Sequence, residues 1–96
     1  MFTTMKIFKK EPLKLISGDT YAVLTGDYAG EMLVYVYTDV LYHKFLSLPL
    51  MENRNIPKEK FVFGMNNHII EFVERVPKKF YKVIEAQHQK NENINN

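Results

Sequence analysis

The sequence contains no cysteine and no tryptophan among its 96 residues. Without cysteine the chain cannot form disulfides, use a thiolate nucleophile or bind zinc through sulfur. It also lacks any apolar run near the roughly 18 residues of a membrane-spanning helix. No hydrophobic stretch follows the first lysines, as a signal peptide would require. We therefore expect a soluble, cytoplasmic protein with no membrane partner.

The chain also has little excess of positive over negative charge, because 13 basic and 11 acidic residues leave a net charge of only +2. Such a balance does not by itself predict nucleic-acid binding. Hydrophobic residues make up 46% of the chain and aromatic residues 14%, which is enough for a packed core. A chain of this length holds one domain, to which we assign residues 1–90. We expect the polar residues 91–96 to be a disordered tail.

Turn residues divide the chain into short apolar segments rich in aromatic and β-branched side chains, which is typical of a mostly β domain. Residues 1–12 are interpreted as an arm or a first strand. We predict strands over 21–25, 31–37 and 41–48, a loop over 49–57, and strands over 60–65 and 68–73 joined by a tight turn at Asn66 and Asn67. The strand over 31–37 is apolar on both faces, as a central strand is. Together these elements suggest a small, strongly bent antiparallel barrel.

The segment after Pro77 has a helical period, and proline is well accepted in a first helical turn. One helical stripe would hold Val76, Phe80, Val83, Ile84 and Gln87. This predicts a C-terminal helix over about 77–89, with Phe80 and Ile84 in the core. The same period also allows one turn followed by a strand over 81–86, and it does not separate the two.

A turn motif runs from Gly18 over about residues 18–37. It combines an opening glycine and aspartate, two alternating apolar residues, and a glycine-bounded turn with an aromatic ring: Gly18, Asp19, Tyr21, Val23, Gly26, Tyr28 and Gly30. This segment resembles the KOW motif of SH3-like barrels in ribosomal proteins and transcription elongation factors. The resemblance implies a small SH3-like antiparallel barrel whose turn contacts RNA, DNA or protein.

The segment departs from the KOW pattern in two ways. Leu33 stands near the place of a further glycine, and Asp27 and Glu31 flank the turn where basic residues are common. An acidic turn points towards a protein partner. The chain is also short, free of cysteine and rich in Lys, Asn, Ile, Phe and Tyr. In these respects it resembles the small accessory proteins of large tailed phages. That resemblance implies the host cytoplasm.

No pattern of catalytic residues stands out, and we predict neither an enzyme nor a cofactor. The three histidines, His43, His68 and His88, are scattered over different segments, whereas a metal site needs ligands that converge on one point. The clustered acids fall at turns and strand ends, where aspartate is favoured because it bonds nearby amides. We therefore predict no metal site.

Three functional hypotheses remain. The leading hypothesis is a non-enzymatic binding module. If the chain is a phage accessory protein, this module would bind and modulate a host protein. Its contact residues would be Asp27, Tyr28, Glu31 and Arg54, the last of which comes from the predicted loop. The second is a KOW-type nucleic-acid-binding protein of transcription or translation. It would act through Lys78, Lys79, Lys82 and Tyr28, although the same lysines also fit the solvated face of an amphipathic helix. The third is a structural subunit that self-assembles into a homo-oligomer through a sheet edge.

Overall fold

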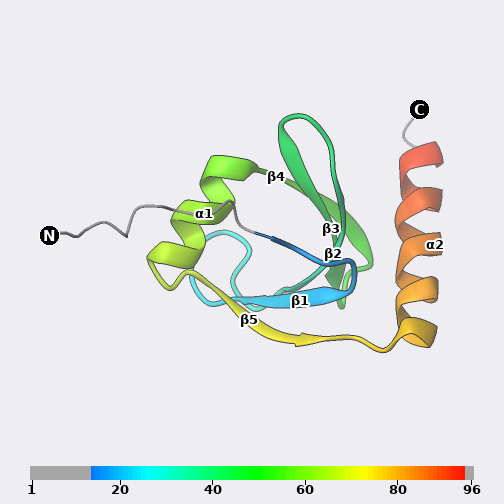
Figure 1. Cartoon of the computed structure of the whole chain (residues 1–96), viewed down its shortest axis with the longest axis horizontal. Helices are drawn as coiled ribbons and strands as arrows, with labels where there is room; N and C mark the ends of the chain where they lie inside the picture. The colour runs from blue at the N-terminus through cyan, green and yellow to red at the C-terminus, as the bar shows by residue number, and fades with distance from the viewer. Residues whose placement is uncertain (1–13, 95–96) are drawn as a thin grey trace, which may run out of the picture.

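The computed structural model describes residues 14–94, which form one five-stranded sheet and two helices. The elements are, in chain order, β1 (Asp19–Val23), β2 (Met32–Thr38), β3 (Tyr42–Leu48), β4 (Glu52–Pro57), α1 (Lys58–Asn66), β5 (Ile70–Arg75) and α2 (Lys78–Ile94). The strands are antiparallel and lie in the order β4-β3-β2-β1-β5 (Figure 1). The arm or strand predicted over residues 1–12 lies outside the described residues.

The predicted mostly β character is confirmed, and the first three strands lie within two residues of their predicted positions. β2 is the central strand and is buried on both faces, as its unbroken apolar run indicated. Leu33 and Tyr35 belong to one buried cluster, whereas Val34 and Val36 belong to another. Because successive side chains of a strand point to opposite faces, the sheet separates these two cores.

The predicted loop over residues 49–57 is wrong for most of its length. Only a short turn follows β3, and β4 then pairs with β3 from Ser47↔Glu52 to Tyr42↔Pro57. The polar sequence of β4 fits an edge strand, which needs few apolar side chains. Pro57 is its last residue, where a proline removes no internal ladder bond.

The predicted strand over residues 60–65 is also wrong, because this segment is the helix α1. Phe61 is buried in the core, and Gly64 packs so closely on Ile70 that an added Cβ atom would lie 2.7 Å from the Ile70 Cδ1 atom. The predicted hairpin turn at Asn66 and Asn67 is the end of this helix instead, and the Asn67 amide donates to the Phe63 carbonyl. The strand predicted over 68–73 exists, but as β5 it begins at Ile70.

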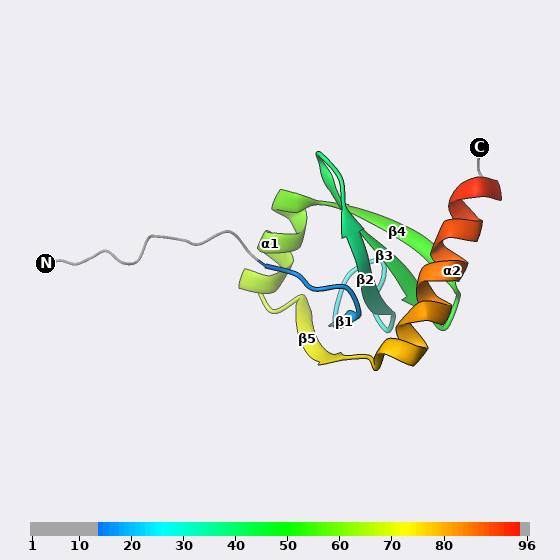
Figure 2. The same ribbon diagram turned by 45° about the vertical axis from the view of Figure 1, so that its right-hand side comes forward.

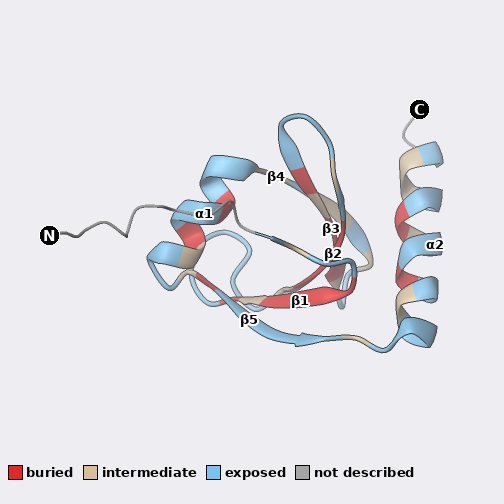
Figure 3. Ribbon diagram, in the orientation of Figure 1, coloured by how far each residue is buried: buried red, intermediate tan, exposed pale blue. Residues whose placement is uncertain are grey.

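The C-terminal segment is a helix, so the alternative of a turn and a strand is wrong. α2 continues to Ile94, and residues 91–94, predicted to be tail, belong to it. Ile84 is buried as predicted, but Phe80 is 47% exposed and Val83 is 56% exposed. The buried stripe instead runs through Tyr81, Ile84 and His88 on the side that faces the sheet (Figure 3).

The two helices lie on opposite sides of the sheet (Figures 1 and 2). We call the first buried cluster the inner core; it contains Tyr21, Val23, Leu33, Tyr35, Phe45, Phe61 and Ile70. α1 contributes Phe61 to it and lies between the edge strands β4 and β5. The outer core consists of Val34, Val36, Leu46 and Ile84, and α2 covers it.

The edge strands β4 and β5 do not pair with each other, so the sheet is not closed. β5 is exposed along nearly its whole length (Figure 3). Its pairing with β1 shifts register between Thr20↔Glu74 and Tyr21↔Phe72, which leaves Val73 as an extra residue in a β-bulge. Near the end of β5, Arg75 Nε donates to Asp19 Oδ1 at 2.7 Å.

Candidate functional site

The turn between β1 and β2 carries the KOW-like residues and forms one wall of a groove. Gly26 and Gly30 have φ angles of +94° and +93°, a backbone region that glycine adopts without steric cost. Asp27 and Tyr28 between them are exposed to solvent. The two glycines therefore allow the turn conformation in which Asp27 and Tyr28 are exposed.

Three of the four residues predicted for partner binding lie together. Arg54 on β4 donates from Nε and Nη2 to the two carboxylate oxygens of Glu31, each at 3.0 Å. Its guanidinium carbon also lies 4.5 Å from the centre of the Tyr28 ring, in the geometry of a cation–π contact. Residues 23 or more positions apart in the sequence thus hold the turn against β4.

The Glu31–Arg54 ion pair is largely buried, and both groups are charged at neutral pH. The hydrogen bonds from Arg54 hold the pKa of Glu31 below its ordinary value despite burial, and those to Glu31 raise the pKa of Arg54. The buried Ser47 hydroxyl donates to Glu31 Oε1 at 2.7 Å, and Arg54 Nη1 lies 3.2 Å from Glu52 Oε1. Since these groups satisfy one another, Glu31 and Arg54 position the turn, while Asp27 and Tyr28 remain available to a ligand.

The groove runs between this turn, β4 and α1 and has a volume of about 470 Å³. Its lining is mostly apolar: Val23, Tyr28, Leu33, Ile56, Pro57, Phe63, Ile69 and Ile70, with the exposed Asp27 and Lys60 beside them. Phe63 on α1 is 60% exposed although it is aromatic. The groove therefore combines a floor that reaches the inner core with two accessible rings, Tyr28 and Phe63.

Phe63 and Lys60 were not among the predicted site residues, because their segment was predicted to be a strand. In a strand, residues three apart point to opposite faces, whereas on a helix they lie on the same side. The signal that would have found them is Pro57 followed by Lys60 and Phe63, read as the first turns of a helix.

The lysines of the nucleic-acid hypothesis lie elsewhere. Lys78, Lys79 and Lys82 are exposed on the first turns of α2. Arg75, the last residue of β5 and three positions before α2 begins, pairs with Asp19 at the start of β1, whereas the turn with Tyr28 follows the other end of β1. Tyr28 and the lysines are therefore at opposite ends of that strand.

The three histidines occupy three separate places. His43 is buried beside the inner core and bonded to Thr38, His68 is exposed after α1, and His88 is buried between α2 and the sheet. Burial lowers the pKa of both His43 and His88. Within residues 14–94, no group of three or more His, Cys, Asp or Glu side chains is arranged to hold a metal ion.

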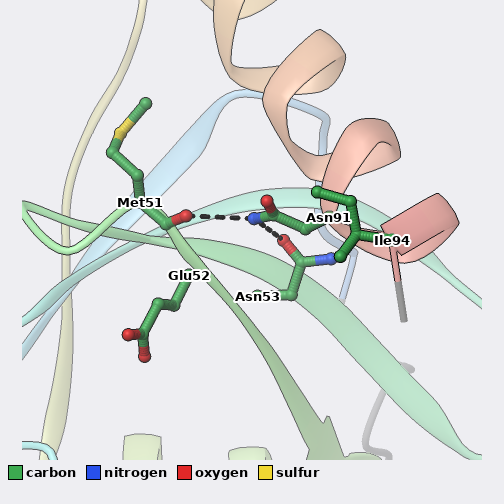
Figure 4. Close-up of a pocket in the computed structure, with 5 residues that line it drawn as sticks. All are labelled: Met51, Glu52, Asn53, Asn91 and Ile94. Carbon is green, nitrogen blue, oxygen red and sulfur yellow. Dashed lines mark hydrogen bonds between the residues drawn. The ribbon is translucent and has the colours of Figure 1, made fainter.

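A second hollow, of about 320 Å³, lies where α2 ends beside β4 (Figure 4). The Asn91 amide donates there to the Met51 carbonyl at 3.0 Å and to Asn53 Oδ1 at 2.9 Å. Asn53 in turn donates to the His88 carbonyl at 3.1 Å. These side-chain amides bond to one another and to the backbone, so they fasten α2 to β4, and we assign them a structural role.

Neither protein-family models nor the curated proteins searched give a match to this chain. In the part of the chain that the structure describes, no helix is both long enough and apolar enough to cross a membrane.

Proposed function

We propose that this protein is a non-enzymatic binding module whose groove takes an apolar segment of a protein partner. The observation that carries the proposal is that the KOW-like turn forms one wall of an apolar groove. Tyr28, braced by Arg54, lies on that wall, and the exposed Phe63 lines the same groove. Accessible aromatic rings beside a concave apolar surface are typical of interaction sites.

The charges around the groove favour a protein over a nucleic acid. Asp27 is exposed beside Tyr28, and the charge of Arg54 is balanced by Glu31 and Glu52. A phosphate backbone would meet the Asp27 carboxylate on this wall, and among residues 14–94 the groove offers it one exposed cation, Lys60 on the α1 side. A partner that places an apolar side chain against the two rings and a cation near Asp27 fits the groove better.

We also propose that the fold is an SH3-like barrel. A bent antiparallel sheet of five strands, with a short helix before the last strand, supports an SH3-like barrel related to KOW-motif proteins. If the chain is a phage accessory protein, as its composition suggests, the partner is a host protein in the host cytoplasm, and binding modulates it.

Capture of partners from a bacterial lysate on the tagged protein, with and without nuclease, tests the proposal. We expect a stoichiometric protein partner that survives nuclease, and Tyr28→Ala or Phe63→Ala should each reduce its recovery roughly tenfold or more, as loss of an interface anchor does. Val40→Ala is the matched control, because Val40 is an apolar residue that is 84% exposed outside the groove.

Recovery of proteins only through nucleic acid, so that nuclease removes them, would refute the proposal. So would a partner that both groove variants retain in full. Folding of each variant is checked by circular dichroism, so that a lost partner is not confused with a lost fold.

A further inference from the structure

Among the described residues, α2 presents a second exposed apolar surface, on the flank that turns away from the outer core. Two apolar side chains that the helical period had suggested for the core, Phe80 and Val83, are 47% and 56% exposed there. Val83 separates two shallow hollows of about 450 and 470 Å³, the first beside Pro77 and Phe80 and the second beside Ala86 and Gln87. We call this surface the α2 flank.

The charges on the α2 flank are all of one sign. Lys79 lines the first hollow, and Lys82 and Lys90 line the second. Because a helix turns by about 100° per residue, Glu85 lies about 160° around the axis from Val83. It is three residues from Lys82 and so borders the flank only at that lysine, whereas Lys79 and Lys90 lie close to Val83.

The other acid of this helix is engaged with the sheet. Glu92 accepts a hydrogen bond from the Tyr37 hydroxyl at 3.0 Å, and its carboxylate lies 3.9 Å from Lys44 Nζ. It is therefore not free to neutralise the lysines of the α2 flank.

We propose that the α2 flank binds an amphipathic helix of a protein partner that has acidic residues beside its apolar stripe. Phe80, Val83 and Gln87 are spaced as i, i+3 and i+7, so they form one ridge along the helix. The two hollows beside Val83 accept the apolar side chains of a facing helix, as in ridges-into-grooves packing. Lys79, Lys82 and Lys90 then meet the acidic rim of that helix.

Other occupants fit less well. A second copy paired through the same flank would set its lysines against those of the first, which costs free energy. A single nucleic-acid strand would find only one ring to stack on, Phe80, whereas binding of single strands relies on successive rings. Two exposed apolar side chains are also too few for a helix that lies in a membrane surface.

This surface is separate from the groove. α2 covers the outer core, whereas the groove opens to the inner core on the other side of the sheet. The inference therefore does not depend on the proposed function, and a partner on one surface would leave the other surface accessible.

Amide NMR spectra of the isotope-labelled full chain, titrated with a designed peptide, test the proposal. The probe is a capped peptide of about 18 residues with leucine at i, i+3, i+4 and i+7, glutamate at the positions beside that stripe, and alanine and glutamine elsewhere so that it forms a helix. We expect shifts confined to residues 77–90 and a dissociation constant that Phe80→Ser or Val83→Ser raises about tenfold. Val40→Ser, an exposed apolar residue in the turn between β2 and β3 and outside α2, is the matched control and should leave the dissociation constant unchanged.

Three comparisons decide the outcome. The same peptide with lysine in place of glutamate should not bind, and higher salt should weaken the acidic probe. No shift at millimolar acidic peptide, equal binding of the lysine peptide, or shifts centred on Tyr28 and Phe63 would overturn the proposal. Tighter binding of oligothymidylate than of the acidic peptide to residues 77–90 would also overturn it and make this flank a nucleic-acid surface.

Discussion

Replacement of Ile84 by alanine tests how much α2 contributes to the fold. Ile84 is 1% exposed and packs in the outer core with Val34, Val36 and Leu46. Truncation of a buried isoleucine to alanine costs about 2–5 kcal/mol, because apolar contact is lost and a cavity remains. Alanine returns a few tenths of a kcal/mol through its higher helix propensity. We therefore expect the free energy of unfolding to fall by about 2–4 kcal/mol, a large part of the roughly 5–10 kcal/mol typical of a small domain.

The neighbouring Val83 is the matched control for this measurement. It is 56% exposed, so Val83→Ala removes little buried area and should change the free energy of unfolding by less than about 0.5 kcal/mol. Urea unfolding followed by circular dichroism gives both values. If Ile84→Ala costs less than about 1 kcal/mol, or no more than Val83→Ala, then α2 does not seal the outer core and the reasoning fails.

Two further predictions concern charged and titratable groups. Arg54→Ala should lower the free energy of unfolding by about 2–4 kcal/mol, because it leaves the Glu31 carboxylate largely buried without its partner. Since the pKa of folded Glu31 is lowered, this difference between wild type and variant in urea unfolding should shrink as the pH falls through that pKa; a constant difference would contradict it. Burial lowers the pKa of His88, so the unfolded chain binds more protons, and stability should fall as the pH drops from about 7 to 5. In His88→Leu, the urea midpoint should change less with pH between 7 and 5, although buried His43 still contributes part of the change. The exposed His68→Gln should leave the pH dependence as in the wild type. Equal pH dependence in both variants would refute the assignment of the effect to His88.

The sequence predicted the first half of the fold well because local signals there agree. Glycine turns lie on both sides of β1 and before β2, and Thr38 and Asp39 mark the break between β2 and β3. The run of β2 is apolar on both faces, which leaves only a central position for it. β4 was missed because its side chains are polar, so its strand character depends on pairing with β3, which no local pattern encodes. α1 was missed because a run of nine residues with one buried aromatic has no distinct period.

The candidate site, like the fold, was predicted only where local sequence signals determine it. The turn chemistry around Tyr28 was readable from its glycines, and Arg54 was chosen for its residue type. Their contact, however, arises from strand pairing across the sheet. Phe63 could not be assigned to the groove while its segment was taken as a strand. The predicted stripe of α2 was about one position out of phase, so Phe80 and Gln87 were placed where Tyr81 and His88 face the sheet.

The two edges of the open sheet bear on how the protein behaves at high concentration. A straight, apolar edge strand is a template on which other chains aggregate. Here β5 has a bulge at Val73 and three charged residues, Glu71, Glu74 and Arg75. β4 is fastened at one end by the amides of α2 and ends at the other in Pro57. The open sheet therefore offers a neighbouring chain no straight, apolar edge suited to fibril growth among the described strands.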